Sequence, residues 1–109
     1  MISGEFIKGS LKTLVLNLLK REGALHGYAI IRKIEELTGG KMKLSYGAIY
    51  PILYKLKNDG VLVTSSDIYN NRIRIYYALT DKGQSVAKEK NKELTEFIQS
   101  IQHIVGPKT

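Results

Sequence analysis

The chain of 109 residues contains no cysteine and no tryptophan, and it has only two prolines and two histidines. Without cysteine there is neither a disulfide framework nor a thiolate-ligated zinc site, which agrees with a reducing, cytoplasmic setting. Two histidines without HExxH or HxxxH spacing provide no metal site, so we expect neither a metal nor another cofactor. No apolar run approaches the ~18–20 residues that cross a bilayer, and the N-terminus lacks the layout of a signal peptide. We therefore expect a cytoplasmic protein without a membrane partner.

The signatures of common enzyme classes are also missing. There is no cysteine nucleophile and no GxxxxGK phosphate-binding loop, and two histidines leave no plausible serine–histidine–acid set. Glu35 and Glu36 are adjacent on a predicted helix, so their carboxylates diverge and do not suit paired acid–base chemistry. We expect no enzymatic activity.

Acidic residues are outnumbered: ten Asp and Glu stand against 17 Lys and Arg, for a net charge of +7. The excess lies mainly in the middle third, where residues 41–76 hold six basic side chains against two acidic ones. A basic balance favours polyanionic partners such as nucleic acid or an anionic membrane surface.

The first 60 residues show the 3.6-residue apolar period of amphipathic helices. It predicts a helix over residues 10–22 with Ser10 as its N-cap and Gly23 after its end, and a second helix over residues 28–38. A third helix follows Ser45, its predicted N-cap, and closes at Gly60. Its core stripe is Ile49, Ile52, Leu53 and Leu56, which leaves Gly47, Tyr50, Pro51 and Tyr54 on the other side. We expect Pro51 to bend this helix or to loosen its first turn.

After Gly60 the period changes to two, which is typical of strands. Residues 61–64 and 72–77 predict a β-hairpin whose turn contains Asn70 and Asn71, residues that tolerate positive φ. A last helix is predicted over residues 81–105 with Thr80 as its N-cap. Gly83 in its first turn costs ~1 kcal/mol of helix propensity relative to Ala, so we expect a close backbone approach there. Three short helices, a hairpin and a long helix make an α+β, mainly helical fold, the winged helix-turn-helix.

The third helix is the candidate recognition helix, because a DNA major groove about 12 Å wide admits one helix. Tyr46, Tyr50 and Tyr54 offer hydroxyls to phosphates or base edges and rings to thymine methyl groups, and Gly47 permits a close approach. Ser45 and the free N–H groups at the helix start can hold a phosphate. The alternative interpretation is that the tyrosines pack against the second helix or the hairpin.

The hairpin is the candidate wing. Arg72 and Arg74 are two residues apart and project on one face, next to Asn70 and Asn71 at the tip. This combination suits phosphate contacts and insertion into the minor groove. The alternative is an ordinary charged edge strand facing solvent.

Three further residues flank these elements. His26 and Tyr28 stand at the start of the second helix, whose N–H groups can bind a phosphate, and Lys43 precedes the third helix. We include them among the candidate DNA contacts. For His26 the competing interpretation is a turn or capping residue.

The last helix predicts a homodimer. Its apolar residues are spaced by threes and fours, as in a coiled-coil seam: Leu94, Phe97, Ile98, Ile101, Ile104 and Val105. A helix of ~25 residues is ~37 Å long, and the small core cannot cover all of it. A second copy under two-fold symmetry is the simplest cover, and it would space two recognition helices ~34 Å apart for a palindromic operator. Alternatively the helix folds back on the first helix. The two arrangements can coexist, because Leu16 could join the dimer interface: it lies outside the main apolar stripe of the first helix, which is Leu11, Leu14, Val15, Leu18 and Leu19. We therefore divide one compact domain into a DNA-binding region, residues 1–79, and a dimerisation helix, residues 80–109.

The ordered pattern resembles the PadR family of bacterial winged-helix regulators. The matching residues are Gly9–Leu19, His26–Tyr28, Ser45–Pro51, Leu53, Leu56, Gly60 and Arg72–Gly83. The resemblance implies a repressor of the branch with a short C-terminal region, which binds double-stranded operator DNA through recognition helix and wing and dimerises through its last helix. Some relatives bind phenolic or flat aromatic effectors between paired aromatics. This chain has no tryptophan and only Phe97 as an aromatic in the last helix, so the existence and identity of a small-molecule effector stay open. The alternative functions are a winged-helix module that binds protein instead of DNA, and a ligand-responsive regulator with an effector site at the dimer interface.

Overall fold

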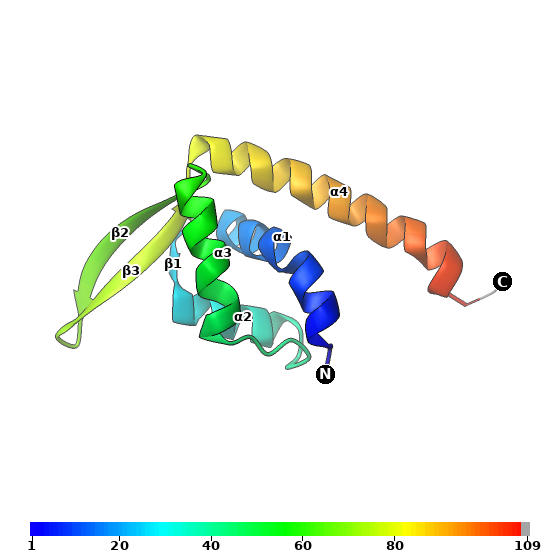
Figure 1. Ribbon diagram of the computed structural model, residues 1–109, viewed down its shortest axis with the longest axis horizontal. Coiled ribbons are helices and arrows are strands. Elements are labelled where there is room, and N and C mark those ends of the chain that lie inside the picture. The colour runs from blue at the N-terminus through cyan, green and yellow to red at the C-terminus, as the bar shows by residue number, and fades with distance from the viewer. Residues whose placement is uncertain (108–109) are drawn as a thin grey trace.

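The computed structural model describes residues 1–107, and it has the expected order of elements with one addition (Figure 1). The elements are α1 (Gly4–Glu22), β1 (Leu25–His26), α2 (Gly27–Leu37), α3 (Tyr46–Asn58), β2 (Leu62–Tyr69), β3 (Arg72–Leu79) and α4 (Asp81–Val105). The strands form one antiparallel sheet in the order β1-β3-β2. The fold is the predicted winged helix-turn-helix with a long terminal helix.

Helix α1 begins earlier than the sequence pattern suggested. Ser10 is not an N-cap but lies inside the helix, where its hydroxyl donates to the carbonyl oxygen of Phe6 at 3.1 Å. Serine can bond to a backbone carbonyl one turn back as readily as it caps, so its presence alone does not mark a helix start. The extra turns are held by Ile7, which is buried, and by the backbone N–H of Ile2, which donates to the carbonyl of Lys41.

The connection between α1 and α2 contains a short strand where we expected no regular structure. Leu25 and His26 of β1 pair with Tyr77 and Tyr76 of β3. Two residues carry no detectable period, so this strand could only be found from its partner. The pairing fixes the start of α2 against the base of the wing.

The wing is longer than predicted. β2 continues to Tyr69 through a polar stretch, and each of its residues pairs with β3. Asn70 and Asn71 form the turn with φ values of 50° and 61°, the positive values expected of them. A two-residue turn of this kind matches the twist of the flanking strands and fixes their register.

The core is a single cluster in which α1 is covered on more than one side. Leu11, Val15 and Leu18 of α1 are buried, as the main stripe predicted, but Leu16 is fully buried as well. Leu16 is therefore unavailable for a dimer interface, and that suggestion was wrong. The reason is that α4 packs along α1, so α1 needs apolar side chains on a second side.

The start of α4 is anchored to the turn before the wing. The Thr80 hydroxyl accepts from the N–H of Gly83 at 3.0 Å and donates to the carbonyl of Gly60 at 2.6 Å. A Cβ at Gly83 would lie 2.1 Å from the carbonyl oxygen of Val61. The close approach predicted at Gly83 is confirmed, and it explains a glycine in the first turn of a helix.

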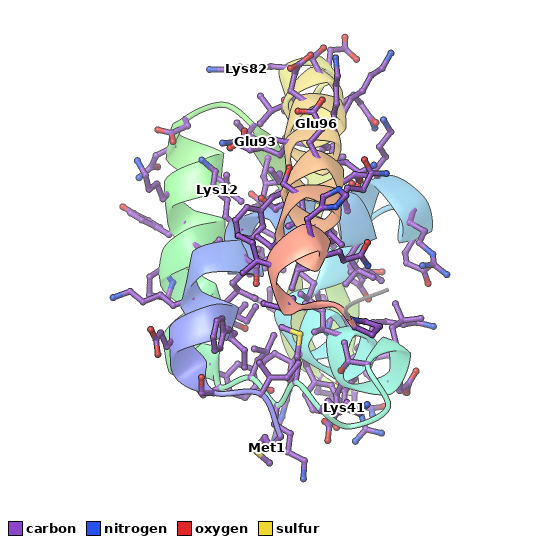
Figure 2. The ribbon with its side chains drawn as sticks, turned by 90° about the vertical axis from the view of Figure 1, so that its right-hand side faces the viewer. Met1, Lys12, Lys41, Lys82, Glu93 and Glu96 are labelled. Atoms are coloured by element: carbon purple, nitrogen blue, oxygen red, sulfur yellow. The ribbon has the colours of Figure 1, made fainter. Side chains whose placement is uncertain are left out.

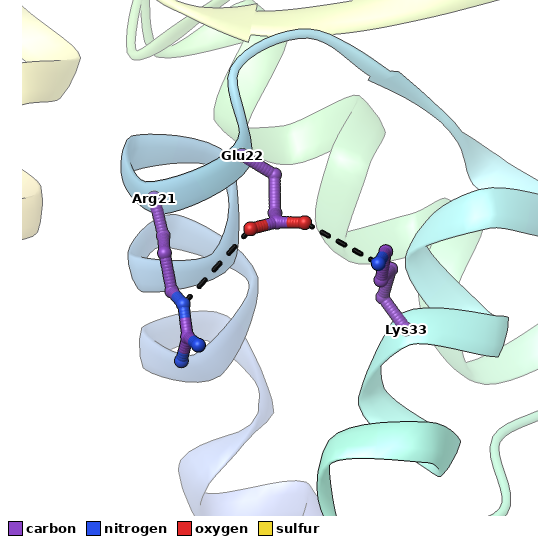
Figure 3. A network of polar contacts seen from close by, with 3 residues as sticks. All are labelled: Arg21, Glu22 and Lys33. Atoms are coloured by element: carbon purple, nitrogen blue, oxygen red, sulfur yellow. Dashed lines mark ion pairs between the residues drawn. The ribbon is translucent and has the colours of Figure 1, made fainter.

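A small ionic network joins the end of α1 to α2 (Figure 3). Glu22 lies 3.9 Å from Arg21 and 3.5 Å from Lys33. Such exposed pairs contribute at most ~1 kcal/mol each. The positions of the helices are therefore determined by the apolar core.

Candidate nucleic-acid interface

Helix α3 has the two sides that the sequence predicted. Ile49, Leu53 and Leu56 are buried, whereas Tyr50 is 43% and Tyr54 67% exposed. The Ser45 side chain accepts from the N–H of Ala48 at 3.2 Å, so Ser45 is the N-cap. The helix runs without a break through Pro51, which lies on the exposed side.

The three candidate tyrosines of this helix are not equivalent. Tyr46 and Tyr50 stack with ring centroids 5.5 Å apart. A Cβ at Gly27 of α2 would come within 2.7 Å of the Tyr50 hydroxyl, so Tyr50 also packs on the start of α2. The packing interpretation therefore holds in part for Tyr50, while Tyr54 is the most exposed of the three.

His26 is the N-cap of α2, in agreement with the capping interpretation. Its Nδ1 accepts from the backbone N–H of Ala29 at 3.2 Å. The ring stacks parallel to Tyr28 at 6.3 Å and meets Tyr76 edge-on at 5.5 Å. Burial, and to a lesser extent the charge of Arg74, lowers the pKa of His26 from its ordinary value of 6.5. The neutral ring is the form that can accept the capping hydrogen bond.

The wing presents its two arginines on one face. Arg72 lies opposite Tyr69 and Arg74 opposite Asp67, so these four side chains share that face. The Arg74 guanidinium stands 4.0 Å above the ring of Tyr69. This cation–π contact orients Arg74, which leaves less side-chain freedom to be given up when a phosphate binds.

The wing, the start of α2 and α3 enclose a cleft of about 750 Å³, here called the wing-side cleft. Its lining includes the predicted residues His26, Tyr28, Tyr46, Tyr50, Asn70, Arg72 and Arg74. Its only charged side chains are the two arginines, and no acid lines it within the described residues. The cleft therefore combines positive charge with aromatic rings, a chemistry that suits a phosphate backbone.

The other predicted residues lie elsewhere. Lys43, Ser45 and Gly47 line a separate groove on the far side of α3, and Tyr54 and Asn71 line neither hollow. Five residues that line the cleft were not predicted: Gly27, Tyr69, Ile73, Ile75 and Tyr77. Tyr69 could have been found from its position opposite an arginine across a two-residue turn. Ile73 and Ile75 flank the predicted Arg74 on the same strand, while Gly27 and Tyr77 depend on how α2 packs against the sheet.

Residues 15–89 match the family described as the PadR-like family of transcriptional regulators. This chain belongs to that family. It is 36% identical over 94 residues to the transcriptional regulator YqjI of Escherichia coli, covering 86% of this chain and 43% of that protein, so it spans less than half the relative's length. A transcriptional regulator from Clostridium thermocellum has a similar structure, with a TM-score of 0.81, 28% identity and coverage of 96% and 99% of the two chains. PadR of Bacillus subtilis in complex with operator DNA matches with a TM-score of 0.65 and 32% identity, over 72% of this chain and 45% of that one.

The PadR-like family consists of transcriptional regulators and not of enzymes. Within residues 1–107 no group of three or more potential metal ligands occurs. In the same part of the chain, no helix has the length and apolar character to cross a membrane.

The far half of α4 carries the second notable surface of this PadR-family chain. The helix extends along and past α1 (Figure 1), antiparallel to it, and leaves Phe97 59%, Ile104 84% and Val105 74% exposed. Ile98 is exposed too, while Leu94 and Ile101 are half-buried. Packing of α4 against α1 thus covers the first half of α4 and part of Leu94, but it leaves the end of the apolar stripe exposed. Phe6 of α1, 71% exposed, borders the same area and was missed by the sequence analysis.

Proposed function

We propose that this chain regulates transcription by binding double-stranded operator DNA sequence-specifically, as a homodimer, and that it acts as a repressor. The observation that carries the proposal is the exposed side of α3 beside a cleft whose charged lining, among residues 1–107, consists of Arg72 and Arg74. The recognition helix would read base edges in the major groove while the wing holds the backbone. The operator complex of the Bacillus subtilis PadR supports this use of the fold.

The homodimer is the second part of the proposal. The uncovered apolar end of α4, together with Phe6, forms a patch that a monomer seldom leaves in water. A two-fold partner would cover it and present two recognition helices to a palindromic site. In this division residues 1–79 contact DNA and residues 80–109 hold the dimer.

Selection of bound fragments from a genomic DNA library, followed by binding isotherms on the selected site, tests the proposal. A specific site with two-fold symmetry is expected, bound at least ~1,000-fold more tightly than unrelated DNA. Equal affinity for all sequences, with a protein partner recovered instead, would favour the protein-binding module. Placing the site over a reporter promoter then distinguishes repression from activation.

The wing provides a sharper test of the same interface. Arg72→Ala and Arg74→Ala should weaken binding to all sequences and lower the slope of log K against log salt by ~0.9 for each phosphate that is no longer neutralised. Lys88→Ala on α4, an equal change of charge at an exposed position outside the cleft, is the control. If both arginine variants keep the slope of the unmodified chain, the wing does not contact the backbone.

A further inference from the structure

A second groove lies on the side of α3 away from the wing. It has a volume of about 670 Å³, and its walls come from α1 and from the first turns of α3. Gly47 and Pro51, from the exposed side of α3, line this groove, whereas Tyr46 and Tyr50 line the wing-side cleft. Helix α3 is therefore a ridge between two hollows, and only one of them has been assigned an occupant.

The rim of this groove is basic. Lys8 and Lys12 of α1 lie one turn apart on the same side of the helix, and Lys43 precedes α3. All three are exposed, and Figure 2 shows Lys12 on the α3 side of α1. No acidic side chain lines the groove in the described part of the chain, and none of the three lysines belongs to an ion pair found there. Three cations around one hollow without an internal partner indicate an anionic occupant.

The dimensions of DNA identify that occupant. A helix with its side chains is about 10–12 Å across and the major groove is about 12 Å wide, so a helix lying in the groove has a phosphate backbone on each side. In such a complex the wing-side cleft with Arg72 and Arg74 would face one backbone, and the groove with the three lysines would face the other.

We propose that Lys8 and Lys12 of α1, together with Lys43, bind phosphates of the second DNA strand, so that α1 is part of the DNA interface. This inference rests on the proposed function and adds to it the contacts on the second side of the recognition helix. The N-terminus of α3, capped by Ser45, opens into the same groove and adds backbone N–H groups to the three cations.

The floor of the groove is apolar, being formed by Ile7, Leu11, Leu44 and Ile52. An amphipathic carboxylate would use both the floor and the rim, whereas a DNA backbone needs only the rim. DNA is favoured because the groove adjoins the exposed side of α3 and shares Gly47 and Pro51 with it. Binding of an amphipathic carboxylate in place of DNA is one of the outcomes that the following experiment distinguishes.

The test compares two double variants that remove the same charge: Lys8→Ala with Lys12→Ala, and Lys88→Ala with Lys92→Ala on α4, as the matched control. Neither control lysine lines the groove or forms an ion pair in the described residues. Thermal unfolding of each variant verifies the fold. Binding to the selected operator is measured from about 50 to about 200 mM salt, the range over which phosphate contacts have a large effect on affinity.

Removing two phosphate contacts should lower the slope of log K against log salt by ~1.8, so that the affinity change over this salt range becomes about 12-fold smaller than for the unmodified chain. The control should keep its slope. Neutral methylphosphonates placed on the strand next to α1 should weaken the unmodified chain and leave the α1 variant unaffected.

An unchanged slope in the α1 variant, while the unmodified chain binds its operator and the wing variants have a smaller slope, would overturn the inference and leave the proposed function standing. Lysine-dependent binding of decanoate with no change in slope would overturn it in favour of an amphipathic ligand. If the unmodified chain binds no DNA, the proposed function fails and the inference fails with it.

Discussion

Two parts of the molecule, the wing and the far half of α4, project from one core (Figure 1). Both expose apolar side chains. In the wing, Ile68 is 72% and Ile73 is 73% exposed, and the two lie opposite each other across the hairpin. In the far half of α4, Ile104 and Val105 are exposed to a similar degree. Apolar exposure alone does not distinguish the two projections.

Their charges do. Residues 94–105 contain one charged side chain, Glu96, whereas the wing places two arginines and two asparagines at and beside its tip. Apolar residues interleaved with cations suit a polyanion with a shaped surface, and an apolar stripe with almost no charge suits another protein surface. The comparison indicates that one fold uses its two ends for two kinds of partner.

The largest effect is expected when negative charge is introduced into the apolar stripe of α4, which removes the contrast between the two projections. Leu94→Asp combined with Ile98→Asp should raise the dimer dissociation constant more than ~100-fold, because two unpaired carboxylates would be buried at a cost of ~3 kcal/mol or more. Light scattering at micromolar concentration should then find a monomer. The monomer should bind DNA weakly and unfold more easily, since dimerisation stabilises the folded state.

The matched control is Gln99→Asp, which adds a negative charge at an exposed position of the same helix that lies outside the apolar stripe. It should remain a dimer. A monomeric unmodified chain, or a double variant that stays fully dimeric, would show that this stripe does not form the interface.

The second prediction concerns the half of α4 that is already covered. Gly83→Ala should lower the free energy of unfolding by about 3 kcal/mol, because the new Cβ meets a backbone carbonyl that cannot move without shifting the start of β2. Ser85→Ala, two residues on and exposed, should change it by less than ~0.5 kcal/mol. Equal urea midpoints for the two variants would mean that the first turn of α4 is not anchored as described.

The spacing of apolar residues in the sequence predicted the elements of the two projecting parts better than it predicted the contacts in the core between them. The stripes of α3 and α4, the caps Ser45 and Thr80 and the hairpin turn follow from local spacing, and the structure has them. The strand β1 and the burial of Leu16 depend on contacts between segments distant in the chain, which spacing does not encode. The lysines of α1 escaped notice for the same reason: only the packing of α1 beside α3 brings them to one groove.

The third prediction concerns the DNA-facing part of the molecule. It distinguishes residues that contact DNA from residues that only position those contacts. Tyr54→Ala should weaken specific binding by ~1–3 kcal/mol with little effect on folding, because Tyr54 is largely exposed. Gly27→Ala should also weaken it, by pushing the Tyr50 hydroxyl from its position over α2, although Gly27 has no side chain to offer DNA.

Combining Gly27→Ala with Tyr50→Ala separates these roles. If Gly27 acts through Tyr50, the double variant should bind no more weakly than Tyr50→Ala alone. Fully additive effects would show that Gly27 acts by another route, and unchanged isotherms for Tyr54→Ala would remove that residue from the interface.

The smallest predicted effect is a pH dependence confined to the DNA-facing end. His26 caps α2 only when its Nδ1 is unprotonated, and its pKa is lowered in the folded state by burial and by Arg74. Its contribution to stability is therefore complete above the unfolded pKa of 6.5 and is lost as the pH falls through the lowered folded value. His26→Asn keeps a capping side chain without a titrating group, so the difference in unfolding free energy between it and the unmodified chain should change between about pH 8 and about pH 5. A His26→Asn difference that is constant over this range would show that the cap does not titrate with folding.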